Sequence, residues 1–280
     1  MTNIAATDFS GKTAFVTGGA QGIGFAIAEA LAKRGANIML ADINEAGLIQ
    51  AKENLSKLNT QVEYCLCDVA NADAVQAGAD KTIERFGKVH YVVNNAGVAL
   101  GGAVGETPLN DWRWIVDINL MGVVYGCEIF TPLIKSHGEG GHIVNTASMA
   151  GHVSLGGMGP YHATKFAVVG YSECIRQELA PYKIGVSALC PGWVQTEIHL
   201  STKNSPTNAG TEVVQNEQFL AIAQLIENGL EPNRLGEWVA DSIVANRQYI
   251  FTHPDMRPAI EMRYHGVQAD YAACDKHFGE

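Results

Sequence analysis

The sequence predicts an α/β fold: a single domain in which a doubly wound parallel sheet is covered by helices on both faces. Three observations lead to this prediction. Short runs of β-branched and apolar residues alternate with longer stretches of helical periodicity up to about residue 190. A glycine-rich segment separates the first run from the first helical stretch. The chain has 280 residues, 47% of them hydrophobic, which is enough for one large core.

Six short apolar strands are expected in this region, at 13–17, 37–41, 61–66, 89–94, 142–146 and 185–190. Helices are expected between them, at 22–34, 45–58, 73–86, 110–134 and 161–182. The first helix carries Ile23, Ile27 and Leu31 on one stripe and ends at Gly35. Because a helix separates each strand from the next, the strands should run parallel and be buried on both faces.

The pattern loosens after Pro191. A polar loop is expected at 201–211, helices at 212–227 and 232–246, a short strand at 249–252 and a terminal helix at 255–276. We interpret residues of about 195–230 as a substrate loop or lid inserted into the single domain of residues 1–280, and 255–280 as a C-terminal extension. A surface loop with no role is the alternative for the first of these.

Charge and composition exclude several classes of function. The formal net charge is −10 and the isoelectric point is near 5.4, which disfavours nucleic acid and anionic membranes as partners. Neither a signal peptide in residues 1–10 nor an apolar run approaching ~18 residues is visible, so a cytoplasmic location is expected. Six cysteines without a C-x-x-C pair suggest reduced thiols. No His, Asp or Glu cluster has metal-ligand spacing, so no metal is expected.

The glycine-rich segment has the features of a phosphate-binding loop. Gly18, Gly22 and Gly24 allow a tight turn, a close approach of backbone to a pyrophosphate and close packing of helix on strand. The helix that follows presents free N–H groups and the positive end of its dipole to the phosphates. Because this loop lies between a strand and a helix, it predicts dinucleotide binding through Gly18 to Gly24, including Ala20, Gln21 and Ile23.

Asp42 indicates which dinucleotide is bound. It ends the second strand, 18 residues after Gly24, where a carboxylate can reach the adenosine ribose hydroxyls and would repel a 2′-phosphate. Neither Gln21 nor Ile43 supplies the basic group that usually accompanies NADP. The expected cofactor is therefore NAD.

Tyr161 and Lys165 are four residues apart in a predicted helix, so both side chains lie on one face, one turn apart. The pKa of a free tyrosine is about 10, and lowering it by roughly three units needs about 4 kcal/mol. An ammonium and a positively charged cofactor ring in a dry pocket have the right charge for this. The pair is a candidate acid/base centre, although a solvated helix face would show the same spacing.

In this order the glycine-rich loop, Asp42, the run 94–97 and the pair Tyr161 and Lys165 resemble the short-chain dehydrogenase/reductase family over roughly residues 9–200. The resemblance implies a three-layer Rossmann fold and an NAD-dependent oxidoreductase. It also implies further cofactor contacts: a pair of residues after the third strand borders the adenine, the run 94–97 contacts its ribose, and the segment after the sixth strand contacts the nicotinamide carboxamide. The expected NAD-binding residues are Gly18, Ala20, Gln21, Gly22, Ile23, Gly24, Asp42, Ile43, Asp68, Val69, Asn95, Ala96, Gly97, Tyr161, Lys165, Pro191, Gly192, Val194 and Thr196.

The same resemblance implies four catalytic residues. Ser148, 13 residues before Tyr161, matches a serine that orients the substrate. Asn119 matches a helix asparagine that holds a water in a proton relay. Tyr161 would be the acid/base, while Lys165 would lower the pKa of Tyr161 and bind the nicotinamide ribose. An ordinary turn serine and a packing or bulge asparagine are the alternatives for Ser148 and Asn119.

The implied reaction is hydride transfer between NAD(H) and a secondary alcohol or ketone. Two other classes stay open: a catalytically silent NAD-binding regulatory protein, and an NAD-dependent lyase or epimerase on the same fold. A silent family member typically loses the tyrosine or the lysine, whereas this chain keeps both Tyr161 and Lys165.

Three segments should form the substrate pocket, at 98–104, 149–159 and 193–211. They are mostly apolar and, apart from Lys203, place no basic group to bind an anion, so a bulky apolar substrate of aromatic or alicyclic type is expected. The candidate contacts are Ser148, Met149, Val153, Leu155, Met158, Tyr161, Trp193, Ile198 and His199. The C-terminal part loosely resembles family members that oxidise benzylic alcohols, such as the Cα-dehydrogenases of lignin-derived aryl ethers.

The resemblance further implies a homo-oligomer, a tetramer or a dimer, packed through the helices near residues 110–135 and 161–182. Apolar residues on these helices agree with that, but packing within one chain would explain them equally well.

Overall fold

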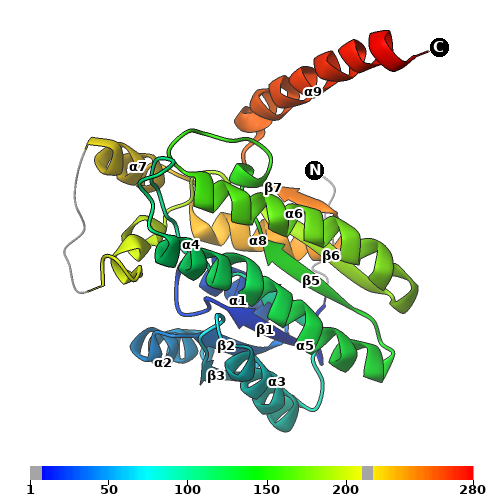
Figure 1. Cartoon of the computed structure of the whole chain (residues 1–280). Helices are drawn as coiled ribbons and strands as arrows, with labels where there is room; N and C mark the ends of the chain where they lie inside the picture. The colour runs from blue at the N-terminus through cyan, green and yellow to red at the C-terminus, as the bar shows by residue number, and fades with distance from the viewer. Residues whose placement is uncertain (1–7, 210–216, 280) are drawn as a thin grey trace.

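A single parallel sheet of seven strands organises the computed structural model, which describes residues 8–209 and 217–279 except the side chain of Gln218. The strand order is β3-β2-β1-β4-β5-β6-β7, and all neighbours pair in parallel (Figure 1). The strands are β1 Thr13–Thr17, β2 Asn37–Asp42, β3 Val62–Leu66, β4 Tyr91–Asn94, β5 Gly141–Thr146, β6 Ile184–Cys190 and β7 Tyr249–Phe251. This confirms the predicted α/β fold with a doubly wound parallel sheet in a single domain.

Helices cover both faces of the sheet and divide the core into two clusters. One cluster holds buried residues of α1 Gly22–Lys33, α2 Glu45–Leu55 and α8 Pro232–Val244. The other holds buried residues of α3 Ala72–Phe86, α5 Gly122–His137 and α6 Gly159–Leu179 (Figure 1). The remaining α-helices are α4 Leu109–Val116, α7 Glu217–Glu227 and α9 Arg257–Phe278. Short 3₁₀ helices lie at Met149–Gly151, Ala180–Tyr182, Ile198–Asn204 and Pro254–Met256.

Local sequence signals explain where several helices begin and end. The side chain of Asn44 accepts a hydrogen bond from Gly47 N at the start of α2, and Asn71 caps α3 in the same way. Gly87, with φ of 76°, ends α3 in a conformation that side chains disfavour. These residues set the helices between strands whose ends carry the candidate site.

Two predicted elements differ in kind from those observed. The expected helix 110–134 is divided by a π-helical turn, Asp117–Met121, which separates α4 from α5. The expected loop at 201–211 is partly a 3₁₀ helix, Ile198–Asn204. Residues 210 and 211, and the first residues of the helix expected at 212–227, lie outside the described residues.

Within the part of the chain that the structure describes, one helical stretch, Leu109–His137, is long and apolar enough to cross a membrane by length and composition alone. Ile115, Phe130 and Ile134 within it are fully buried in this chain. We therefore interpret it as a core helix of the α/β fold, since such helices pass the same test.

Candidate active site

The predicted site residues meet at the carboxyl ends of the strands, around β1 and β4. The strand order reverses between these two strands, because β2 and β3 lie on one side of β1 and β4 to β7 on the other. This is where open α/β sheets bind ligands. The structure brings to this edge the glycine-rich loop after β1, the run Asn95–Gly97 after β4, Ser148 after β5 and Pro191 after β6.

The glycine-rich loop has the geometry of a dinucleotide cradle. Gly18 and Gly22 have φ of 62° and 58°, which only glycine adopts without strain. A Cβ added at Gly24 would overlap the carbonyl oxygen of Gly18 and approach Asn95 Nδ2 to 2.6 Å. No side chain caps α1, whose N-cap residue is Gln21, so its first N–H groups stay available to phosphate oxygens. These features fit NAD.

Thr17 and Asn95 hold this loop against β4. The Thr17 hydroxyl accepts hydrogen bonds from Asn95 N at 2.9 Å and from Ala96 N at 3.0 Å. Asn95 Nδ2 donates to Thr17 O at 3.1 Å, and Thr146 donates to Asn95 Oδ1 at 3.3 Å. Asn95 therefore joins the ends of β1, β4 and β5, and Thr17 is a positioning residue that the sequence motifs did not single out.

Asp42 is held in place at the end of β2. Its carboxylate accepts hydrogen bonds from Ala20 N at 3.1 Å and from Asn44 N at 3.0 Å. The neighbouring Ile43 is 63% exposed, and Asp68 is also exposed, whereas Val69 is buried in the core. Ile43 and Asp68 are thus exposed near a fixed carboxylate, where they could meet the adenosine of a dinucleotide, whereas Val69 is a core residue.

Tyr161, Lys165 and Ser148 form the candidate catalytic centre. Lys165 Nζ lies 5.7 Å from the centroid of the Tyr161 ring and donates a hydrogen bond to Thr146 O at 2.8 Å. Burial lowers the pKa of Lys165 to about 8. Burial also raises the pKa of Tyr161, and a hydrogen bond with the Ser148 side chain opposes that rise. Burial therefore favours the neutral phenol, and the lowering of this pKa by Lys165 together with the charge of the cofactor ring stays a prediction.

Asn119 lies in the π-helical turn and is fully buried. Its side-chain amide accepts from Val98 N at 2.8 Å and donates to Val98 O at 2.9 Å, and it lies 3.4 Å from the Thr164 hydroxyl. The amide thus holds the loop after β4. A Cβ added at Gly97 would lie 3.2 Å from Asn119 Oδ1 and 3.6 Å from Lys165 Nζ, so Gly97 keeps this corner open.

The segment after β6 is held by a residue that sequence reasoning missed. His253 Nδ1 accepts a hydrogen bond from Gly192 N at 3.1 Å, so Nε2 carries the proton and donates to Trp193 O at 3.0 Å. Met256 packs on Gly192, where an added Cβ would lie 2.8 Å from its sulfur. The signal in the sequence was a histidine placed between the last strand and a proline.

The three segments expected to line the substrate pocket do come together. Gly102 N donates to Gly157 O at 2.7 Å, and Ala99 N donates to the Ser201 hydroxyl at 2.9 Å. Leu155 is 63% exposed, so a substrate could contact its side chain directly. Met149 is buried and would support the pocket wall from behind. The half-buried candidates are Val153, Met158, Trp193, Ile198 and His199. His199 Nδ1 is buried without a hydrogen-bond partner, and its ring contacts Phe219 at 5.6 Å.

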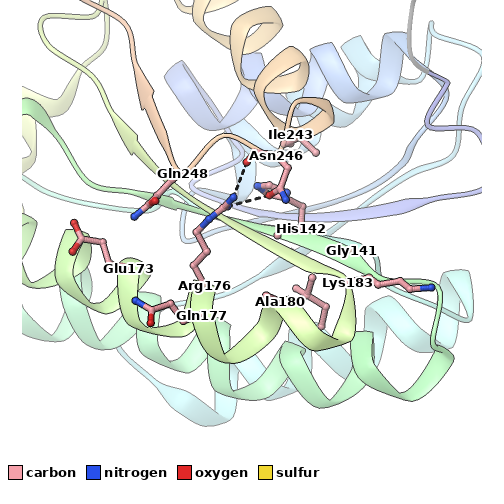
Figure 2. A pocket seen from close by; sticks show the side chains of 12 residues that line it. Gly141, His142, Glu173, Arg176, Gln177, Ala180, Lys183, Ile243, Asn246 and Gln248 are labelled. Atoms are coloured by element: carbon pink, nitrogen blue, oxygen red, sulfur yellow. Dashed lines mark hydrogen bonds between the residues drawn. The ribbon is translucent and has the colours of Figure 1, made fainter.

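Two cavities outside the catalytic centre are also present. One, of about 300 Å³, borders the glycine-rich loop at Gln21 and Thr196. The other, of about 540 Å³, lies at the amino ends of β5 and β6, far along the sheet from Tyr161 (Figure 2). Arg176 lines the second cavity, but its guanidinium already donates to the side chain and backbone of Asn246. Neither cavity replaces the catalytic centre as the candidate site.

One group of possible metal ligands, His90, His137 and Glu139, gathers among residues 8–209 and 217–279. The group lies at the amino end of β4, away from Tyr161. Lys12 and Lys88 both form ion pairs with Glu139, and the two nitrogens of His137 contact backbone atoms. These contacts explain the group without an ion, and two lysines beside it oppose the binding of a cation.

Fold and site together are those of a dinucleotide-dependent oxidoreductase. Comparison with known proteins identifies the family to which the chain belongs. The family model described as short chain dehydrogenase matches residues 12–206. The chain is 35% identical to a CLA biosynthesis dehydrogenase/reductase of Lactiplantibacillus plantarum, over 95% of this chain and 96% of the relative. It is 33% identical to a C alpha-dehydrogenase of a Sphingobium species, over 93% and 86%.

A solved structure resembles the whole fold. It is a short-chain dehydrogenase/reductase from Burkholderia phymatum in complex with NAD, with a TM-score of 0.88, 36% identity, and coverage of 94% of this chain and 96% of that one. The chain belongs to the short-chain dehydrogenase/reductase family. It is therefore an oxidoreductase of this family, and the NAD bound by the solved relative agrees with the cofactor predicted from Asp42.

Proposed function

We propose that this protein interconverts a secondary alcohol and a ketone on a bulky, mostly apolar substrate, with Tyr161 as the acid/base. The observation that carries the proposal is the meeting of Tyr161, Ser148 and Lys165 at the carboxyl end of β5, next to a loop shaped for a dinucleotide. The half-buried side chains expected to line the pocket are mostly apolar, and Lys203 is the exposed basic side chain among the pocket segments.

NAD held by the glycine-rich loop would supply the hydride acceptor, and its oxidised nicotinamide ring would bring a positive charge to the site. In the oxidation direction Tyr161 takes the proton from the substrate hydroxyl as the carbinol hydride leaves. Ser148 donates a hydrogen bond to the same oxygen and so aims the carbinol carbon. In reduction Tyr161 returns the proton to the ketone oxygen.

Lys165 has two functions in this proposal. Its ammonium, with the cofactor charge, offsets the rise that burial causes in the pKa of Tyr161. Its other donors bind the nicotinamide ribose, while one stays bonded to Thr146 O. Asn119 completes a proton relay through water.

The proposed substrate is an alcohol whose carbinol carbon lies next to an aromatic ring. The likeness to a protein named C alpha-dehydrogenase supports this, as do the half-buried apolar side chains Met158, Trp193 and Ile198. The unpartnered Nδ1 of His199 offers a place for one polar group of the substrate. We also propose that the segment of about 195–230 acts as a lid over this pocket and that the protein is a cytoplasmic homo-oligomer.

The proposal is tested with a panel of secondary alcohols and ketones of graded bulk, with NAD(H) absorbance at 340 nm as the readout. We expect turnover to increase from small aliphatic to aryl substrates. We also expect Tyr161→Phe to lose at least about 1000-fold in kcat, since general acid–base catalysis contributes roughly 10²–10⁴-fold. Binding of NAD, measured by fluorescence titration, should change little because Tyr161 is one of many expected cofactor contacts and the others remain.

Two results would contradict the proposal and separate it from its alternatives. No turnover of any panel member by a protein that binds NAD would favour a catalytically silent regulatory protein. Conversion of substrate without net NADH would favour a lyase or epimerase. Lys165→Arg is the companion variant: it keeps the charge but changes donor geometry, and we expect a large loss of kcat together with weaker NAD binding.

A further inference from the structure

The C-terminal helix α9, Arg257–Phe278, projects away from the rest of the chain (Figure 1). None of its residues is buried, and only Ile260 is half-buried. Its anchor is Arg263, whose guanidinium lies 5.1 Å from the ring of Phe166 on α6. At 22 residues the helix is about 33 Å long, so most of it extends beyond this anchor.

One side of α9 is apolar in a regular pattern. Six residues recur at intervals of four and three, which is the heptad spacing of a helix that packs against another helix. They are Ile260, Tyr264, Val267, Tyr271, Cys274 and Phe278. Tyr264, Tyr271 and Phe278 are 54%, 63% and 77% exposed. We call these six residues the α9 seam.

The seam needs a partner for α9 to be stable. Gly266 lies in the middle of the helix, and a helix of this length without tertiary contacts is marginal in water. The three exposed aromatic residues offer on the order of 400 Å² of surface, about half of what each partner contributes to a standard protein interface. Exposed apolar surface of this extent marks a binding site.

Charge decides against a membrane as that partner. Arg257, Arg263 and Lys276 are matched by three acidic residues on the same helix, so α9 has no net charge. Helices that bind anionic lipid are rich in basic residues, and the whole chain carries a charge of −10. The heptad spacing instead suits a helical surface, and a second copy of this chain brings one in its own α9 seam.

We infer that the α9 seam packs against a second copy of this chain. The inference deepens the proposed homo-oligomer and rests on that part of the proposed function. The seam contains no catalytic residue, so a failed test of the seam would not count against the proposed reaction. Absence of turnover in the substrate panel would likewise not count against the seam.

Cys274 allows a direct test, because it lies on the seam and its thiol is exposed in a single chain. The rate at which iodoacetamide alkylates Cys274 is measured by peptide mass spectrometry on the full chain, alongside the mass of the assembly by light scattering. We expect an oligomer in which Cys274 reacts at least about tenfold more slowly than in Tyr271→Glu, the equivalent of roughly 1.4 kcal/mol of protection. Tyr271→Glu should also shift the assembly toward smaller species.

Met262→Glu is the matched control. Met262 is 75% exposed on the opposite side of α9, so its replacement should change neither the alkylation rate nor the mass. Circular dichroism and the melting temperature of the body of the protein show that each variant is folded. Three results would overturn the inference: Cys274 reacting equally fast in wild type and Tyr271→Glu, protection of Cys274 in a monomer, or Met262→Glu exposing Cys274 as Tyr271→Glu does.

Discussion

At the scale of residues, the candidate catalytic centre contains two buried ionisable groups, Tyr161 and Lys165. Burial lowers the pKa of Lys165 to about 8 and raises the pKa of Tyr161. Both shifts favour the neutral forms, because removing a charge from water is costly. In the proposed reaction the positive cofactor ring and Lys165 would together favour the phenolate, so we expect the acid/base function of Tyr161 to depend on bound cofactor.

His253 should affect cofactor binding although it is far from Tyr161 in sequence. We expect His253→Ala to weaken NAD binding by roughly 3- to 10-fold, because the loss of each backbone hydrogen bond to Gly192 and Trp193 costs about 1 kcal/mol. His253→Asn keeps an acceptor near the Nδ1 position and should be less affected. Fluorescence titration with NAD measures the affinity, and the melting temperature is recorded in parallel. A lower melting temperature with unchanged NAD affinity would show that His253 is only structural.

The sequence was sufficient to predict the residues that belong to motifs and insufficient for those that support them. Asp42, Tyr161 and Lys165 occur at spacings that their chemistry requires. Thr17 and His253 have no such spacing, since their partners lie 78 and 61 positions away in the chain. Only the pairing of strands brings them within hydrogen-bonding distance.

At the scale of elements, the loop between β1 and α1 is the most constrained segment of the site. Gly24 allows α1 to approach Gly18 so closely that no side chain fits between them. The π-helical turn Asp117–Met121 is the second such segment, because it directs Asn119 toward Val98. In both segments the backbone adopts a locally less favourable conformation that places one functional group: the phosphate-binding backbone in the loop and the Asn119 side chain in the π-helical turn.

The constraint at Gly24 predicts a strong effect of the smallest substitution. Gly24→Ala should lower the free energy of unfolding by roughly 1–3 kcal/mol, as overpacking of a filled site does, and weaken NAD binding at least tenfold by moving the loop. Denaturant unfolding and NAD titration measure the two effects. Gly170→Ala on α6 is the control, since an added Cβ there meets nothing within 4 Å and should not weaken NAD binding. Unchanged NAD affinity in Gly24→Ala would contradict the proposed close approach.

Strands and most helices were predictable because their apolar periodicity depends only on neighbours in sequence. β1 has its predicted bounds, and α6 differs from its prediction by two or three residues at each end. The π-helical turn was not predictable, because one extra residue in a turn barely changes the apolar pattern of residues 110–134. The seam on α9 required the structure, which shows that this side of the helix faces solvent.

At the scale of the whole molecule, the two ends of the sheet have different functions. The carboxyl ends of the strands carry the cofactor loop and Tyr161. The amino ends carry ion pairs around Glu139 and the cavity lined by Arg176 and His142 (Figure 2). Stability can therefore be altered at the amino ends without touching the reacting groups.

His142 should make the fold sensitive to acid. It is 3% exposed, bonds to Ser187 Oγ at 2.7 Å, and burial, with Arg176 nearby, lowers its pKa to about 3. Because the unfolded chain binds this proton below pH ~6.5, stability falls as the pH drops from 6.5 toward 3. The expected loss is about 2 kcal/mol between pH 7 and pH 5.

Denaturant unfolding at several pH values measures this loss. His142→Gln removes the titrating group, so its stability should depend less on pH over this range than that of the wild type, even if its absolute stability is lower. Equal slopes for the two proteins would show that other groups cause the acid sensitivity.

The strand order also has a consequence for how the sheet is built during synthesis. β1 comes first in the chain; β2 and β3 lie in turn at one of its edges, and β4, β5, β6 and β7 lie in turn on the other side. No strand has to enter between two neighbours that are already paired. The nascent chain can therefore extend the sheet from the centre outward in the order in which its residues leave the ribosome, and no completed pairing has to be reopened.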